Sequence, residues 1–428
     1  MSDDDRLATL FSESIINVLR SWICVLVLAS SAVIGMMIGR YEAVLFSLIA
    51  VVIILVPVLM FRDLTVMPPW YFLVLVCLPV LLGTFVPTVP VTTFFPSLAL
   101  ATLGLLLMVN LHRFTSLRLV PWFTIVLTVL FTLAMACALN LLRWVSDILF
   151  ETSFLLDGRT QDAINASLMI EFFYVTTAGL VAGMIFYRYF QQVSQQPVSR
   201  MVAPSPPERK TPAESAVLSE RLHVSTARQR QVALTMQIIL SLVLVYGIWT
   251  QQLSLFINAT VALAITFIPA VLGRDYGIPI EPGLALWITS AVFLHALGSI
   301  GFYGIIPSWD TLTHTLSATV VAAAGYTTLR AIHLHATAIH LPSWAMFIFT
   351  LVFVLAMGVI WELLEFFTDQ GALLFGLDPV LAQHGINDTI SDLLFNTVGA
   401  LLVATWGTAY LIRVSEHLAT QLESRFNV

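Results

Sequence analysis

The sequence predicts an all-α polytopic membrane protein with about twelve transmembrane helices in two parallel repeats of about six helices each. Its 428 residues are 58% hydrophobic and 10% charged, and the mean hydropathy is +0.92. A water-soluble protein of this length needs about a quarter of its residues charged. Apolar runs of about 20 residues, enough to cross a hydrocarbon core of about 30 Å, recur along the chain. This composition excludes a soluble globular protein.

The apolar runs define the individual spans. We place them at residues 16–39, 42–60, 67–87, 94–112, 119–142, 167–187, 234–250, 253–273, 282–301, 311–331, 343–366 and 390–412. Their ends are set by charged and turn-forming residues, so each boundary is defined only to within a few positions.

The distribution of basic residues predicts the orientation. If the N-terminus is cytoplasmic and every span crosses the bilayer, all of the 19 Lys and Arg residues fall on the cytoplasmic side except Arg40, Arg143 and Arg159. Cytoplasmic loops of membrane proteins carry such an excess of positive charge. We therefore expect a multi-pass protein of the inner (plasma) membrane with both termini in the cytoplasm.

A polar segment divides the chain into three parts. Residues 190–232 are rich in Gln, Ser, Pro, Glu and Arg, as in a cytoplasmic linker, and they separate residues 1–189 from residues 233–428. The two flanking parts share short patterns: Pro57 to Arg62-Asp63 matches Pro269 to Arg274-Asp275 at a constant offset. We interpret the parts as an N-terminal repeat, a linker and a C-terminal repeat.

Polar residues gather in the last four predicted spans, where lipid disfavours them. Those that share a helix face by their spacing are Asp310 with His314, Glu362 with Glu365, and Asp388 with Asp392 and Asn396; His295 lies in the preceding span. Positions i, i+3 and i+4 are neighbours on a helix. Threading places all of these groups near the outer boundary of the membrane, because Asp310 and Arg330 are about 30 Å apart at 1.5 Å per residue.

So many acidic groups in one place need protons or a cation. Two carboxylates 4 Å apart repel by about 4 kcal/mol at an effective dielectric constant of 20. The predicted metal ligands are Asp310, His314, Glu362, Glu365, Asp388 and Asp392, with Asn396 in support. Oxygen and imidazole ligands suit Mg, Mn or Zn, and the histidine favours Mn or Zn. A proton or ion pathway and a purely structural polar network are the alternatives.

At these residues the sequence resembles the YjdF-like family of bacterial inner-membrane proteins and, more distantly, the VanZ-like proteins. The shared pattern is His295-x2-Gly298, Asp310-x3-His314, Glu362-x2-Glu365 and Asp388-x3-Asp392-x3-Asn396 followed by Gly399. It covers roughly residues 235–412. Many members carry Arg-Asn shortly before the aspartate, where this chain has Pro307-Ser308-Trp309. The resemblance implies a site in the C-terminal repeat and no particular reaction.

The N-terminal repeat lacks this set. The region matching Asp310 and His314, near residues 94–105, is apolar. Asp147, Glu151, Asp162 and Glu171 remain without a partner histidine. We interpret this part as a degenerate repeat with a mainly structural role.

Two functions of different classes follow. The first is a metal-dependent membrane enzyme that acts at the outer face on an amphiphile, for example a phosphate-bearing or isoprenoid-linked lipid. His314 or His295 would then be its acid–base group, because imidazole titrates near neutral pH. The second is a secondary transporter or ion-coupled carrier, and a non-catalytic membrane scaffold is a third reading. The expected partners are membrane lipid and a lipid-linked or amphiphilic substrate, with no nucleic acid.

Overall fold

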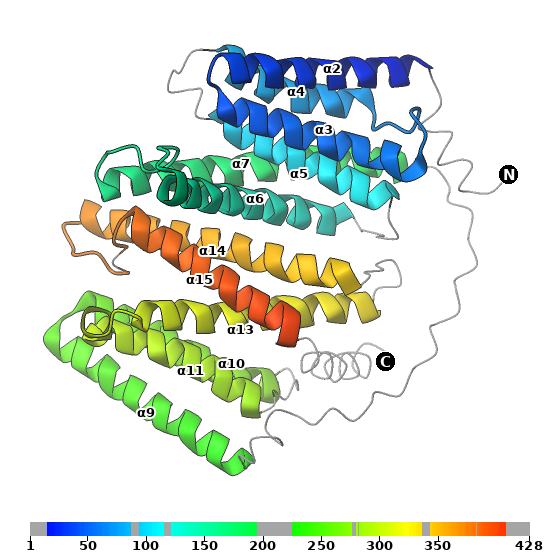
Figure 1. Ribbon diagram of the computed structural model, residues 1–428. Helices are drawn as coiled ribbons and strands as arrows, with labels where there is room; N and C mark the ends of the chain where they lie inside the picture. Colours follow the sequence, from blue (N-terminus) through cyan, green and yellow to red (C-terminus); the bar gives the residue numbers. More distant parts are fainter. Residues whose placement is uncertain are drawn as a thin grey trace. The chain divides into compact units, whose positions relative to one another are not determined.

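The computed structural model describes residues 15–86, 94–114, 121–194, 225–275, 280, 282–335, 343–381 and 383–407, and the regular elements in these ranges are all helical (Figure 1). The helices of the first half are α2 (Ile15–Met37), α3 (Tyr41–Phe61), α4 (Trp70–Phe85), α5 (Phe94–Phe114), α6 (Pro121–Phe150) and α7 (Gln161–Ser194). Those of the second half are α9 (Thr226–Thr250), α10 (Leu253–Asp275), α11 (Pro282–Leu297), α13 (Trp309–His335), α14 (Ser343–Leu374) and α15 (Ile386–Leu402). Each predicted span overlaps one of these helices, with ends that differ by several residues.

Eight of the described helices are long and apolar enough to cross a membrane. They are α2, α3, α6, α7, α9, α10, α14 and the stretch Pro282–Ile305, which begins with α11. Trp70–Phe85 and Phe94–Met108 are shorter apolar helices. The prediction of an all-helical, multi-pass membrane protein is therefore confirmed. Helices α13 and α15 are not among the eight, and these two helices carry most of the predicted site.

The chain divides into two compact units. One comprises Met1–Leu139, Ser167–Pro197 and Ala338–Pro342, and the other comprises Asn140–Ala166, Val198–Thr337 and Ser343–Val428. The second unit thus combines the C-terminal helices with the end of α6, the start of α7 and the loop between them. The predicted division at 1–189, 190–232 and 233–428 stays a prediction, and residues 195–224 of the predicted linker lie outside the described residues.

In the first unit, α2 packs against α3 and α4, and α5 packs against α3 and α4. Buried hydroxyl groups join these helices: Ser31 and Thr84 lie 2.8 Å apart, and Ser21 donates to the carbonyl of Pro68 at 3.0 Å. Cys24, Cys77 and Cys137 are buried free thiols. Such hydroxyl contacts are typical of helices that associate within lipid, where polar groups need partners inside the protein.

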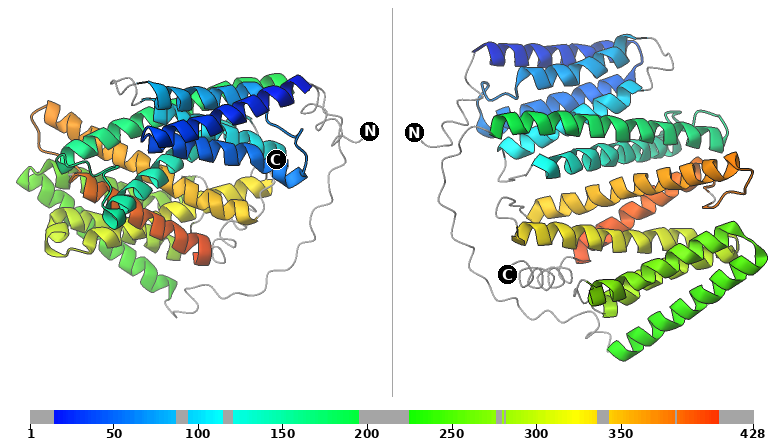
Figure 2. Two further views of the ribbon diagram at one scale, coloured as in Figure 1. Left: turned by 45° about the horizontal axis from the view of Figure 1, so that its top comes forward. Right: turned by 180° about the vertical axis from the view of Figure 1, so that it is seen from behind.

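In the second unit, α9, α10 and α11 pack on one another, and α13, α14 and α15 form a second set joined to it through α11 and α13 (Figure 1 and Figure 2). Between α11 and α13 the chain makes a π-helical turn, Gly298–Phe302, with a kink at Gly301. The φ angle of Gly301 is 129°, a region that only glycine occupies readily. This kink ends the long apolar helix and allows the chain to turn back into α13.

Candidate metal centre

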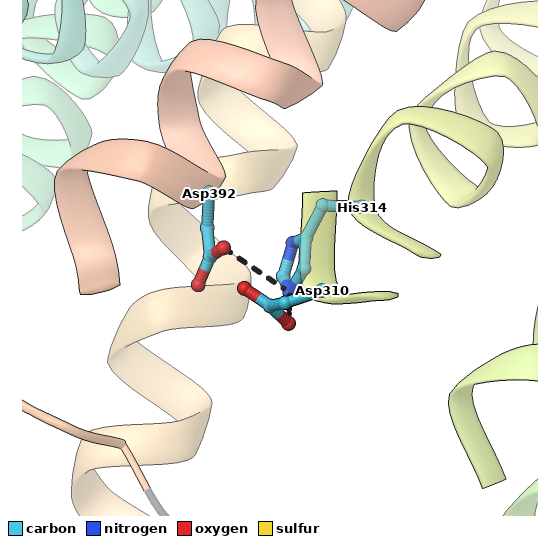
Figure 3. Close-up of side chains that lie close together, drawn as sticks. All are labelled: Asp310, His314 and Asp392. Carbon is cyan, nitrogen blue, oxygen red and sulfur yellow. Dashed lines mark ion pairs between the residues drawn. The ribbon is translucent and has the colours of Figure 1, made fainter. Parts of the chain in front are cut away.

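Three predicted site residues meet where α13 and α15 begin (Figure 3). Asp310 and His314 lie four residues apart on the first turns of α13, and the imidazole Nε2 is 3.5 Å from Asp310 Oδ1. The same Nε2 is 3.5 Å from Oδ1 of Asp392 on α15. One potential ligand atom from each residue lies within 4.8 Å of the other two. The i, i+4 spacing brings two of the groups together, and packing of α15 on α13 adds the third.

The geometry suits a shared divalent ion better than direct hydrogen bonds. A distance of 3.5 Å is long for an N–H···O bond, whose usual value is about 2.9–3.0 Å, and one Nε2 carries at most one proton for two carboxylates. Asp392 Oδ1 is buried and has no hydrogen-bond partner. A cation would satisfy that oxygen.

Close approach of α13 and α15 holds this arrangement. Gly399 lies two turns after Asp392 on the same face of α15. A Cβ atom at Gly399 would lie 2.5 Å from the carbonyl oxygen of Thr315 and 2.8 Å from Cβ of Ala318. Only glycine therefore allows the two backbones to come this close, and Asp392 reaches His314 for that reason.

The start of α13 is also anchored to α11. The indole of Trp309 donates to the carbonyl of Leu294 at 3.0 Å. Its ring lies 4.8 Å from that of Phe302 in the preceding turn. Asp310 follows immediately in the chain, so these contacts fix the position of its backbone.

The compact ligand group, formed by Asp310, His314 and Asp392, contains three of the six predicted ligands. Glu365 lies outside it, and its Oε1 accepts from the indole of Trp361 at 2.7 Å. Glu362 Oε2 accepts from the amide of Gln383 at 2.8 Å. Asp388 Oδ2 accepts from the backbone N–H of His384 at 3.0 Å. Each of these carboxylates therefore accepts a hydrogen bond from within the protein.

Two of the remaining acids are nonetheless deeply buried. Glu362 is 0% exposed and its Oε1 has no hydrogen-bond partner. Thr389, one turn from Asp392, is also fully buried. A buried polar atom without a partner costs about 1–3 kcal/mol. The end of the bundle beside the ligand group therefore holds a buried acceptor, Glu362 Oε1, that a cation, a proton or a polar ligand would stabilise.

His295 lies at the end of α11 and contacts aromatic residues. Its Nδ1 is 2.8 Å from the hydroxyl of Tyr303, and its ring lies 6.3 Å from that of Trp361. Gly298 makes the first contact feasible, because a Cβ there would lie 2.2 Å from the Tyr303 ring. The spacing His295-x2-Gly298 thus has a physical basis in the approach of Tyr303. His295 is outside the compact ligand group but within electrostatic range of His314 and Asp310.

Asn396 lies one turn after Asp392, on the same buried face of α15. It interacts with the imidazole of His314. Gly358 of α14 faces the amide, since a Cβ there would lie 3.2 Å from Asn396 Nδ2. The predicted supporting position of Asn396 thus lies beside the ligand group on its helical side.

Sequence reasoning missed the segment that joins α14 to α15. Asp369 accepts hydrogen bonds from three backbone N–H groups of this segment. Its Oδ1 accepts from Val380 and Leu381, and its Oδ2 accepts from Gln383. Asp369 follows Glu365 by four residues, so helical spacing could have added it to the set. Gln383 offers no such signal, because it lies in a non-helical segment without periodicity.

The first half of the chain contains a similar carboxylate that binds the loop after its helix. Asp147, near the end of α6, accepts from the backbone N–H groups of Phe154, Leu155 and Leu156 and from the hydroxyl of Thr152. Both Asp147 and Asp369 thus stabilise the loop that follows a long helix. Of the first-half acids singled out in the sequence, Asp147 therefore has a structural role in this loop.

Comparison with known families agrees with the membrane assignment. Residues 232–413 match the model of the family described as "Predicted membrane protein (DUF2238)". Residues 5–67 match the model of a "Domain of unknown function (DUF8268)". The first match covers the region in which the YjdF-like resemblance was found, and a VanZ-like relationship is not shown. Searches of curated proteins and of solved structures gave no match.

Proposed function

We propose that this protein binds one divalent metal ion through Asp310, His314 and Asp392 and acts on a lipid or lipid-linked substrate at the outer face of the membrane. The observation that carries the proposal is the convergence of these ligand atoms, from two helices, within 4.8 Å of one another. A mixed set of carboxylate and imidazole ligands suits Mn or Zn, with Mg as a further candidate.

The residues around the ion would have separate roles. A bound divalent ion would polarise a phosphoryl or carbonyl oxygen and lower the pKa of a bound water. With His314 as a ligand, His295 is the imidazole left for acid–base work, and Tyr303 fixes its orientation through Nδ1. Glu362 and Asp388 lie close enough to influence this region electrostatically. The position of the site at the end of a membrane bundle favours an amphiphilic substrate.

An ion-coupled carrier is the second candidate, and one observation favours it. Glu362 is fully buried, lies on a long apolar helix and has an unpartnered oxygen. Ionisable groups within membrane helices often mark proton or ion pathways. The two candidates differ in what they predict. An enzyme keeps its metal ion bound during the reaction, whereas a carrier moves an ion across the membrane of a reconstituted vesicle, and this movement depends on Glu362. A non-catalytic scaffold would do neither.

Metal binding by the purified protein tests the first proposal. We expect about one equivalent of Mn or Zn per chain after dialysis in detergent, removed by a chelator and restored by titration. The measurements are elemental analysis and isothermal titration of the chelated protein with Mn, Zn, Mg and Ca. Phosphate release from lipid-linked phosphates is then assayed with the reconstituted protein. A chelated protein that takes up none of these ions at millimolar concentration contradicts the metal centre.

We also propose that all of the twelve helices cross the inner membrane and that the halves are parallel repeats with the site facing outward. The charge distribution supports the orientation. The parallel use of Asp147 and Asp369 to hold the loops after α6 and α14 supports the repeat.

Cysteine labelling tests this orientation. A cysteine in place of the exposed Asp378, between α14 and α15, should react with an impermeant maleimide on intact cells. A cysteine in place of the exposed Thr65, between α3 and α4, should react only after the cells are opened. The unmodified protein is the control, because its Cys24, Cys77 and Cys137 are buried. The opposite labelling pattern would place the site on the cytoplasmic side.

A further inference from the structure

A chain of side-chain amides leads from the first half of the sequence to the buried acid beside the ligand group. Asn165 on α7 donates through Nδ2 to Oε1 of Gln383 at 2.7 Å, across 218 residues of sequence. Gln383 in turn donates through Nε2 to Oε2 of Glu362 at 2.8 Å. Asn165 is 5% exposed and Glu362 is 0% exposed. Both ends of the chain are therefore shielded from water, and Gln383 between them is partly buried.

The chemistry of the groups fixes the direction of this chain. An ionised carboxylate only accepts hydrogen bonds, so the amide nitrogen of Gln383 must face Glu362. Its oxygen must then face Asn165, which has to present its own amide nitrogen. Asn165 therefore stabilises the same orientation of the Gln383 amide that the carboxylate of Glu362 favours. Without Asn165, Gln383 Oε1 would lose this partner, and the Gln383 amide would be held only from its nitrogen end, which donates to the carboxylate of Glu362 at 2.8 Å and to the backbone carbonyl of Glu362 at 3.4 Å.

A second contact ties the same helix to the start of α15. Gln161 Oε1 accepts from the backbone N–H of Asn387 at 3.1 Å. Gly385 lies against it, since a Cβ there would be 2.9 Å from Cβ of Gln161 and 3.2 Å from Asp162 Oδ1. The φ angle of Gly385 is 84°, which also requires glycine. Gln161 and Asn165 are one turn apart, so a single face of α7 contacts both ends of the segment Gln383–Asn387.

We propose that Asn165 and Gln383 are positioning residues of the site, and that the start of α7 supports the metal centre by orienting Glu362. This inference rests on the proposed metal-binding function. It gives the N-terminal half a direct part in the site, in addition to its structural role. Groups that orient the ligands of a metal, or the acids next to it, typically change metal affinity about 10- to 100-fold when removed.

The test compares two buried asparagines with the same local bonding. Asn165 and Asn110 are 5% and 6% exposed, each donates one hydrogen bond through Nδ2, and each has an unpartnered Oδ1. Asn110 lies on α5 and donates to the carbonyl of Ile53, within the other unit. We expect Asn165→Leu to weaken Mn or Zn binding about 10-fold or more, and Asn110→Leu to leave the affinity unchanged while lowering the melting temperature. Equal affinity losses in the two variants would overturn the proposal.

A double-mutant cycle tests whether the two amides act in one chain. Gln383→Leu should weaken metal binding at least as much as Asn165→Leu, and the double variant should be no weaker than Gln383→Leu alone. Additive losses would mean that the residues act separately and would overturn the chain.

A measurement without metal separates this inference from the proposed function. In chelated protein, the effects of Asn165→Leu and Glu362→Gln on the melting temperature should be non-additive, because both disrupt one hydrogen-bonded chain. If the wild-type protein binds no divalent ion but this coupling is present, the metal function fails and the positioning of Glu362 stands. If the ion binds but the coupling is absent, the amide chain fails and the metal centre stands.

Discussion

Replacing Asp392 by asparagine should weaken binding of Mn or Zn by at least about 100-fold, more than loss of a residue that only orients a ligand. The substitution keeps the size of the side chain and removes its charge. Asp392 is 4% exposed, and its Oδ1 lies 3.5 Å from His314 Nε2. Because the carboxylate is buried, water has little access to replace it as a ligand. Titration of the chelated protein by calorimetry measures the change.

The same variant should have an opposite effect on stability. Without metal, Asp392 is a buried carboxylate with an unpartnered oxygen, and a buried charge that lacks a partner destabilises the fold. Asp392→Asn should therefore melt at the same or a higher temperature than the wild type when both are chelated. Added metal should raise the melting temperature of the wild type only. The combination of lost affinity with unimpaired stability is typical of a ligand site.

Asp378→Asn is the matched control, because it removes a carboxylate of the segment between α14 and α15 that is exposed to solvent. It should bind metal as the wild type does. If Asp392→Asn retains wild-type affinity, or if it melts far below the wild type without metal, Asp392 belongs to a structural network and not to a metal centre.

Helical spacing explains how much of the site could be predicted from the sequence. Asp310 and His314 were paired by their i, i+4 positions, and the structure places their side chains together. Asp392 was placed near them by its depth in the membrane, since its helix begins at the same end of the bundle. Periodicity and membrane thickness constrain a residue along and around its helix, whereas the packing of α15 on α13 determines that Asp392 meets His314.

The partners of the other acids could not be predicted in this way. Glu365 contacts an indole on its own helix, but Glu362 contacts Gln383, whose position depends on a non-helical segment. Asn165 reaches that segment from a helix 218 residues away in the sequence. Spacing along the chain carries no information on such contacts. They follow from packing between elements.

The fold was predictable because lipid restricts the choice of structure to helices or closed barrels. Apolar runs then located each helix. The helices extend beyond the predicted spans at several ends; α14, for example, continues to Leu374 although the predicted span ends at residue 366. The additional turns, residues 367–374, contain Asp369, whose carboxylate accepts hydrogen bonds from the segment that follows the helix.

Adding one methyl group at Gly399 should disrupt both the packing and the metal centre. The Cβ of Gly399→Ala would lie 2.5 Å from a backbone oxygen of α13 and 3.2 Å from the backbone nitrogen of Thr319. Backbone atoms of a helix cannot move aside as a side chain does, so α15 must shift away from α13. We expect a destabilisation of about 1–3 kcal/mol, the usual cost of overpacking. We also expect weaker metal binding, because the shift separates Asp392 from His314.

Gly371→Ala is the matched control for this effect. Gly371 also lies in a helix, α14, but no atom lies within 4 Å of a Cβ placed there. Alanine is favoured over glycine inside a helix by about 0.5–1 kcal/mol, so this variant should be as stable as the wild type or slightly more so, with unchanged metal affinity. Thermal melting in detergent and metal titration of both variants provide the comparison. If Gly399→Ala and Gly371→Ala behave alike, close contact between α13 and α15 is not what brings Asp392 to His314, and the ligand group must be held together by other contacts.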